Sequence, residues 1–234
     1  MSEKNEVVFF EFNEKYLVIS AFKDEQEKIF FNQIEIKKNN TNILNSLDSN
    51  IKSNILKIEK ILKKQINNIN VILNLNRSHY IKFNIFKKKN QKISSSEDLL
   101  YLVQDARLNV VKNNKDLNII HTVIDSYYYD SIRYEKPNYE IKNNNFSMDL
   151  DFICYSSLEI KEFRKLFGKI NLNVERFFCY DYLISFSEKN IFKCKDMHLL
   201  AYKVKSGHNP KEVEIISKKT KNIGFFERIF DYFK

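Results

Sequence analysis

The first forty residues alternate between apolar runs and short polar connections. Apolar, β-branched and aromatic residues dominate three stretches, 7–13 (VVFFEFN), 16–22 (YLVISAF) and 29–36 (IFFNQIEI). Such runs joined by short polar connections are typical of an antiparallel β-meander. We therefore predict three successive antiparallel strands.

The spacing of the apolar positions then becomes helical. Five apolar residues follow one another at intervals of four, four, three and four, which places them on one face of a helix: Leu47, Ile51, Ile55, Ile58 and Leu62. The apolar run Val71–Leu73 follows as a short strand. Residues 1–78 are thus expected to fold as three strands, a helix and a strand.

A second unit begins at His79. Apolar and polar residues alternate from His79 to Phe86, which predicts a strand. Ser94 and Glu97 have the spacing of a capping box and predict the start of a helix. Its apolar face would carry Leu99, Leu102, Val103, Ala106 and Val110. The β-branched and aromatic stretch 117–129 predicts the next strand.

Two further elements follow Pro137. Residues 148–154 alternate as a strand, and Ser156 with Glu159 has the spacing of a second capping box. The helix that it opens would end at Gly168, where a helix C-cap favours a left-handed residue. An alternating strand is predicted next, with apolar residues Ile170, Leu172 and Val174.

The pattern weakens from residue 183 onward. We predict a linker over 183–222, and its polar part 203–222, which contains Gly207 and Pro210, is expected to be largely disordered.

The last residues separate apolar from charged side chains completely on a helical wheel. The apolar side carries Phe225, Phe226, Ile229, Phe230, Tyr232 and Phe233. A dense apolar stripe after a polar tether is typical of an interfacial helix, here residues 223–234. Lys218, Lys219 and Lys221 precede it and would attract anionic lipid. Packing of this helix on the core or in a partner's groove is the alternative.

Composition limits the class of protein. The chain has 234 residues and a formal net charge of +9, which fits one large domain or two small ones and favours anionic surroundings. The N-terminus lacks the basic and apolar regions of a signal peptide, and no run of about 20 apolar residues occurs, so we expect neither secretion nor a transmembrane span. Three widely spaced cysteines, Cys154, Cys179 and Cys194, are expected to be reduced thiols.

Catalytic patterns are weak. The four histidines lack the spacing of metal ligands, and the cysteines lack a recognisable base. Asp149 and Asp151 share one face of a strand and are interpreted as a solvated face. Lysines and aromatics interleave over 79–89, but an ordinary exposed strand explains this pattern better than a nucleic-acid platform. We predict no enzyme, no metal, no cofactor and no nucleic-acid partner.

From about residue 40 to 180, the chain resembles the bacterial cell-division protein FtsA, an actin-like membrane tether. The resemblance is clearest over 147–178, in the serines 156–157, Gly168 and the Leu172–Val174 strand. Residues 93–107 and 120–124 resemble the helix and strand of the family's inserted subdomain, and the tail resembles its membrane-targeting helix.

The resemblance implies an α/β (α+β) fold with four parts. These are a partial actin-like (ribonuclease-H-like) half at 1–78, an inserted SHS2 subdomain at 79–182, a linker at 183–222 and an amphipathic helix at 223–234. FtsA holds ATP with Asp- and Gly-containing loops. The first hairpin here, residues 11–15 (EFNEK), has neither Gly nor Asp, and only three glycines occur in the whole chain. About 55 residues follow Phe178, too few for the second nucleotide half and the further lobe.

The main functional hypothesis is therefore a membrane-tethered docking module at the septum, without ATPase activity, on the cytoplasmic face of the bacterial inner membrane. Its partners would be cell-division proteins and inner-membrane lipid, and homo-oligomerisation is left open. FtsA also binds the division tubulin FtsZ, through a surface that lies in the lobe missing here. We therefore do not infer an FtsZ contact for this chain. The alternative is a peptide-binding adaptor of a pilus-assembly or other envelope machine, similar to the actin-like pilus relatives of FtsA.

Overall fold

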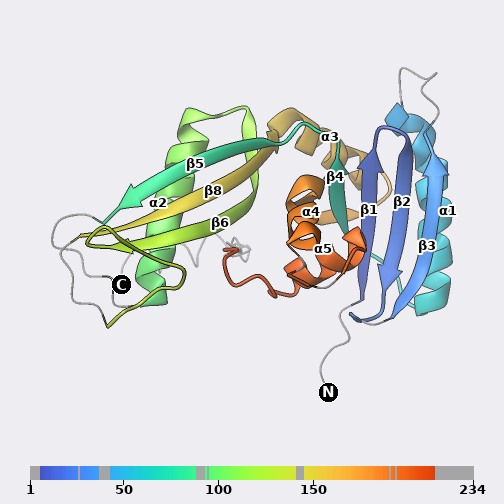
Figure 1. Ribbon diagram of the computed structural model, residues 1–234. Coiled ribbons are helices and arrows are strands. Elements are labelled where there is room, and N and C mark those ends of the chain that lie inside the picture. Colours follow the sequence, from blue (N-terminus) through green and yellow to red (C-terminus); the bar gives the residue numbers. More distant parts are fainter. Residues whose placement is uncertain are drawn as a thin grey trace, which may run out of the picture.

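The computed structural model describes residues 6–25, 27–36, 43–87, 93, 95–140, 145–189, 191–192 and 194–213. These residues form two β-sheets that lie next to one another, each packed with helices (Figure 1).

The first sheet has five strands in the order β3-β2-β1-β4-β9. Their bounds are β1 Val7–Asn13, β2 Tyr16–Phe22, β3 Lys28–Glu35, β4 Asn68–Asn74 and β9 Asn173–Cys179. The first three strands form the predicted antiparallel meander, while β4 runs parallel to β1 and β9 runs parallel to β4. The sheet is therefore mixed, and its last strand comes from a distant part of the chain.

Helices cover both faces of this sheet. Their bounds are α1 Ile43–Leu62, α3 Ser157–Gly168, α4 Tyr180–Glu188 and α5 Met197–Lys205. The Phe10 ring of β1 lies 5.1 Å from the Phe167 ring of α3. The adjacent Phe9 points to the opposite face, where its ring lies 6.1 Å from the imidazole of His198 in α5. Burial on both faces explains why β1 is an almost unbroken apolar run.

The helix predicted from the spacing of apolar residues is α1. Ile51, Ile55 and Ile58 are buried, and Leu62 packs against the core from a partly buried position. The side chain of Leu47 lies outside the described part of the chain.

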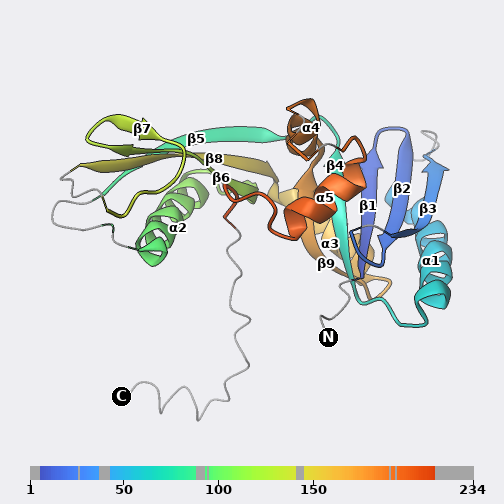
Figure 2. The same cartoon turned by 60° about the horizontal axis from the view of Figure 1, so that its bottom comes forward.

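The second sheet has four strands, in the order β5-β8-β6-β7, and is inserted between β4 and α3. Its bounds are β5 His79–Phe86, β6 Leu117–Tyr129, β7 Ile132–Tyr134 and β8 Phe146–Ser156. Helix α2 (Ser96–Asn113) lies along one face, as Figure 2 shows. The five predicted apolar residues of α2 are buried there, against Met148, Leu150, Phe152 and Cys154 of β8.

The ends of two helices differ from the prediction. The N-cap of α2 is Ser95, whose capping box uses Asp98, one residue later than predicted. Both Ser94 and Ser95 are followed three residues later by an acidic residue, so the spacing of a capping box alone does not distinguish between them. Ser156 precedes α3, but its side chain makes no cap hydrogen bond, because it is still the last residue of β8.

The predicted role of Gly168 is wrong. Gly168 is the last residue of α3, and the left-handed residue is Asn171, with φ 60°. The chain makes one more turn after the helix, in which the amide of Asn171 donates to the Gly168 carbonyl at 3.1 Å. Strand β9 consequently begins at Asn173, after Ile170 and Leu172.

The linker predicted over 183–222 contains ordered structure. Helix α4 extends to Glu188, and α5 spans 197–205. Both bury apolar residues in the core, among them Leu183, Phe186 and Leu200. Each helix is nine residues long, so it offers too few turns for a clear period in the sequence.

The second sheet occupies less of the chain than the predicted 79–182 subdomain. It ends at Ser156, and α3 and β9 return to the first sheet. The predicted amphipathic helix at 223–234 lies outside the described residues.

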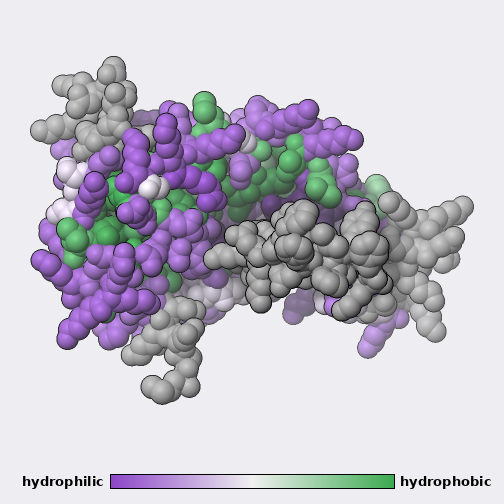
Figure 3. Space-filling model, turned by 180° about the vertical axis from the view of Figure 1, so that it is seen from behind, coloured by the Kyte–Doolittle hydropathy of each residue, from purple (hydrophilic) through white to green (hydrophobic). Residues whose placement is uncertain are grey.

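The three cysteines are free, with Cys154 and Cys179 buried and Cys194 half-buried. Burial raises the pKa of the Cys154 thiol to about 11. In the part of the chain that the structure describes, no helix is long and apolar enough to cross a membrane. Seen from behind, the surface is largely hydrophilic, with separate hydrophobic areas (Figure 3).

Candidate docking site between the two sheets

The β1–β2 hairpin is closed by its own side chain. The Asn13 Oδ1 atom accepts hydrogen bonds from the backbone amides of Lys15 at 2.9 Å and Tyr16 at 2.7 Å. Backbone amides of a tight turn can otherwise hold phosphate oxygens. Here two of these amides are already engaged, and Glu14 adds an exposed carboxylate to the same turn.

A buried polar chain lies between the first sheet and α5. The Ser20 Oγ atom lies 2.5 Å from His198 Nδ1, and His198 Nε2 lies 3.1 Å from Glu11 Oε2. Glu11 Oε1 accepts a further bond from Asn74 Nδ2 at 3.0 Å. Burial pushes the pKa of Glu11 upward, but the bonds from His198 and Asn74 outweigh it, so this pKa lies below its ordinary value.

This serine, histidine and carboxylate have the composition of a hydrolytic triad, but Ser20 is completely buried and His198 almost so. A nucleophile must be within reach of its substrate. The arrangement therefore serves to join α5 to β1 and β2.

A second buried cluster forms where the two sheets meet, and it centres on Glu212. The carboxylate accepts from His121 Nδ1 at 2.6 Å, Arg176 Nη2 at 2.5 Å and the Tyr182 hydroxyl at 3.1 Å. His121 Nε2 accepts the backbone amide of Cys179 at 3.0 Å, so its ring proton resides on Nδ1. Burial raises the pKa of Glu212, but these hydrogen bonds and the Arg176 charge lower it by more. The pKa of Glu212 therefore lies below its ordinary value.

The Glu212 cluster connects three parts of the molecule, namely β6 of the second sheet, β9 of the first, and the segment after α5. That segment also extends the second sheet, because the Val213 amide donates to the Thr122 carbonyl and the Ile124 amide donates to the Lys211 carbonyl, each at 2.8 Å. The two sheets are thus held at a fixed junction.

A groove of about 430 Å³ opens beside this junction, between the helix-free face of the second sheet and α4. We call it the interlobe groove. Its apolar and aromatic lining consists of Tyr80, Val123, Ile153, Tyr182, Phe186 and Ile191. Its polar lining consists of Asp125, Asp151, Asp181, Ser185, Lys189, Asn209 and Lys211. Apolar walls with a few convergent polar groups are typical of a binding site.

Acidic groups dominate the charge of the interlobe groove. Burial raises the pKa of Asp151, and the nearby carboxylates of Asp125 and Asp149 add to this, although Lys82 opposes them. The Lys211 ammonium lies 2.5 Å from Glu135, which balances its charge. Within the described residues, Asp151 has no ion-pair partner within 4.0 Å. A cation brought beside an apolar group would therefore complement the groove.

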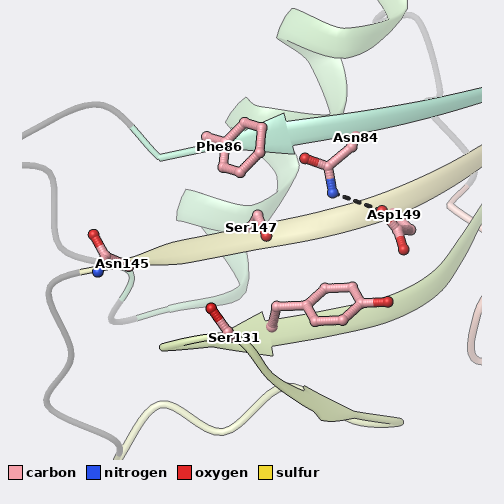
Figure 4. Close-up of a pocket in the computed structure, with 7 residues that line it drawn as sticks. Asn84, Phe86, Ser131, Asn145, Ser147 and Asp149 are labelled. Carbon is pink, nitrogen blue, oxygen red and sulfur yellow. Dashed lines mark hydrogen bonds between the residues drawn. The ribbon is translucent and has the colours of Figure 1, made fainter.

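A second, shallower hollow of about 420 Å³ lies on the same face of the second sheet. Figure 4 shows Asn84 of β5 beside Asp149 of β8, joined by a hydrogen bond of 2.6 Å, with Phe86 further along β5. Asp149 and Asp151 lie two positions apart on β8 and therefore point to the same face. The hollow thus continues the interlobe groove along the sheet.

None of the predicted membrane-binding residues falls in the described part of the chain. Phe225, Phe226, Ile229, Phe230, Tyr232, Phe233, Lys218, Lys219 and Lys221 all lie beyond residue 213. Among the described residues, no group of three His, Cys, Asp or Glu side chains is placed to hold a metal ion.

The sequence prediction did not find the groove or the Glu212 cluster. The sequence pattern predicts a solvated face at Asp151 and a disordered linker at Glu212. One signal pointed to order near Glu212, since residues 212–215 alternate acidic and apolar side chains as a strand does. No comparable signal marks the groove, because its walls come from strands and a helix far apart in the chain.

Comparison with known proteins adds information on the fold. No family model and no curated protein sequence matches the chain. A solved structure of the PilM–PilN type IV pilus biogenesis complex is similar, with a TM-score of 0.51 and 7% identity, over 77% of this chain and 49% of that one. The cytoplasmic domain of EpsL, an inner-membrane component of the Vibrio cholerae type II secretion system, has a TM-score of 0.34 at 13% identity, over 76% and 58% of the two chains.

A Bacteroides thetaiotaomicron protein with an actin-like ATPase fold has a TM-score of 0.33 at 13% identity, over 80% of this chain and 57% of that one. The chain spans about half the length of the PilM–PilN structure that it matches. At such low identity the likeness concerns the fold alone. The molecule has a mixed α/β fold whose solved neighbours include PilM, EpsL and a protein with an actin-like ATPase fold.

Proposed function

We propose that this chain is a docking component of an envelope machine, and that the interlobe groove binds a segment of a partner protein. The groove itself carries the proposal, since it combines apolar walls with an acidic centre at a rigid junction. Support also comes from the name of one fold neighbour, which is a complex of PilM with PilN. The expected partner segment presents a Lys, Arg or free amino group beside a large apolar side chain.

The same proposal includes the absence of ATPase activity and a position at the cytoplasmic face of the inner membrane. The glycine-free β1–β2 hairpin supports the absence of ATPase activity, because two of its backbone amides already donate hydrogen bonds to Asn13. The name of the EpsL neighbour, a cytoplasmic domain of an inner-membrane component, agrees with the proposed position at the inner membrane.

Filling the groove should abolish partner binding. In Ser185→Trp, the indole would extend from α4 into the groove, where Ser185 is a lining residue. We expect the native full-length chain to co-purify a membrane-machine protein from its own cells, and the variant to lose at least nine-tenths of that protein. The bound segment would then be mapped by titrating synthetic peptides of the captured protein.

Ser187→Trp is the matched control, because Ser187 also lies on α4 but does not line the groove. Equal recovery of the partner with both tryptophan variants would contradict the proposal. The identity of the captured protein separates a pilus or secretion machine from the cell-division machine that the FtsA resemblance implies.

Membrane attachment through residues 223–234 is a separate part of the proposal. We expect the full chain to sediment with vesicles that contain anionic lipid, and a chain ending at Asn222 to remain mostly in the supernatant. A single short amphipathic helix binds weakly, so the difference should be largest at low salt and high lipid concentration. Equal sedimentation of the two chains would eliminate the anchor and leave the groove unaffected.

A further inference from the structure

Three arginines from three different elements line a small pocket on the α2 side of the junction. Arg107 comes from α2, Arg164 from α3 and Arg176 from β9, around a volume of about 220 Å³. We call it the arginine pocket. Thr122 lines it, whereas the adjacent Val123 lines the interlobe groove, so the two cavities open on opposite faces of β6.

Arg107 is a half-buried cation that has no carboxylate partner in the described part of the chain. Its Nη1 atom donates to the hydroxyl of Thr122 at 2.7 Å, and Thr122 is almost completely buried. Among the residues that the structure describes, no Asp or Glu lies within 4.0 Å of its guanidinium. Burial therefore lowers the pKa of Arg107 below its ordinary value. A guanidinium has five N–H donors, so this group has capacity for a further acceptor.

Arg164 of α3 is more exposed than Arg107. Its Nη1 atom donates to the Val174 carbonyl at 2.9 Å, and its guanidinium carbon lies 5.2 Å from the centre of the Phe177 ring. These contacts orient the group but do not neutralise it, because the described part of the chain places no carboxylate within ion-pair distance. Burial lowers the pKa of Arg164 as well.

The remaining charges of the pocket are already balanced. Arg176 is paired with Glu212 at 2.5 Å, and Glu175 is paired with Lys205 at 2.7 Å. Among the described residues, two guanidiniums of the pocket thus have no counter-ion, one from α2 and one from α3. Guanidiniums bind planar and tetrahedral oxyanions through paired hydrogen bonds, and two of them match the charge of a phosphate dianion.

We propose that the arginine pocket binds a phosphoryl group, supplied by inorganic phosphate or by a small phosphate monoester. The bound group would bridge Arg107 of α2 to Arg164 of α3, and would thereby tie the second sheet to the first across the junction. The proposal uses residues that are separate from the interlobe groove, so either can fail without the other.

Calorimetric titration of the full chain with sodium phosphate and with glycerol phosphate tests this proposal, with sodium chloride at matched ionic strength as the blank. We expect saturable binding of at least one phosphate compound and none of chloride. Arg107→Gln and Arg164→Gln should each raise the dissociation constant at least tenfold. Tighter binding of glycerol phosphate would identify a monoester as the source, and equal or tighter binding of inorganic phosphate would identify the free ion.

Lys165→Gln is the matched control, since Lys165 is the exposed neighbour of Arg164 on α3 and does not line the pocket. It removes the same charge and should leave the dissociation constant within twofold. A thermal melt provides a second readout, because phosphate should raise the midpoint of the native protein and of Lys165→Gln but not that of the two arginine variants. Absence of saturable phosphate binding, or equal binding by all variants with native far-ultraviolet spectra, would overturn the proposal.

Discussion

Replacing Glu212 with Gln should lower the free energy of unfolding by about 3 kcal/mol at pH 7. The carboxylate is 5% exposed, and Arg176, also largely buried, is its ion-pair partner. Gln preserves the shape but removes the negative charge that pairs with Arg176 at the junction of the two sheets. For a chain of this size, the loss corresponds to a fall in melting temperature of roughly 6–12 °C.

Glu175→Gln provides the comparison. Its side chain is 49% exposed and pairs with Lys205, and pairs of this kind contribute less than about 1 kcal/mol. Chemical denaturation of both variants gives the difference directly. A stability loss for Glu212→Gln no larger than that for Glu175→Gln would show that the cluster does not hold the sheets together.

The Glu212 effect should also depend on pH in a defined direction. Because the pKa of Glu212 is lowered by folding, its contribution is fully present above the ordinary value of 4.5 and is lost as pH falls through the folded-state pKa. The native protein and Glu212→Gln should therefore differ by a constant amount between pH 6 and 7 and converge below pH 4.5. A difference that widens on acidification would contradict this assignment.

Truncating Phe178 to Ala should destabilise the protein by about 3–5 kcal/mol. The ring is completely buried on β9, with ring centroids 6.0 Å from Phe9 and 5.8 Å from His121. The Arg176 guanidinium carbon lies 4.9 Å from its centre. The substitution removes apolar contacts and opens a cavity under the junction, which the rigid sheet cannot close.

Phe86→Ala makes the same chemical change at a side chain that is 71% exposed, and should alter stability by less than about 0.5 kcal/mol. Urea denaturation monitored by circular dichroism compares the two. A loss below about 1 kcal/mol for Phe178→Ala would show that the pocket around the ring collapses or fills with another side chain.

Local pattern predicted the elements of this fold well where each element is long. The meander of β1 to β3 and strand β6 follow from long runs of apolar, β-branched and aromatic residues. The helix α1 and strands β5 and β8 follow instead from apolar periodicity, because each repeats its period several times. The short helices α4 and α5 do not repeat it often enough. Order in 209–213 depends on pairing with β6, which no window of neighbouring residues reveals.

The candidate sites were less accessible to prediction for the same reason. Arg107, Arg164 and Arg176 are ordinary surface-type residues in the sequence, and only the topology places them around one pocket. In the sequence, Asp151 is only a polar position of an alternating strand. Its proximity to α4 depends on the tertiary fold, which brings the two segments together. The Glu212 cluster likewise joins residues that are separated by up to 91 positions.

The insertion of the second sheet has a consequence for the order of folding. Strands β4 and β9 meet across a separation of 105 residues, as the bond between Asn68 and Asn173 shows. The paired strands β5 and β8 bring His79 next to Cys154, so a folded insert shortens the loop that must close to roughly 30 residues. Early formation of the insert would therefore lower the entropic barrier to completing the first sheet by about 1 kcal/mol. We expect the inserted sheet to acquire hydrogen-exchange protection before β9 does during refolding.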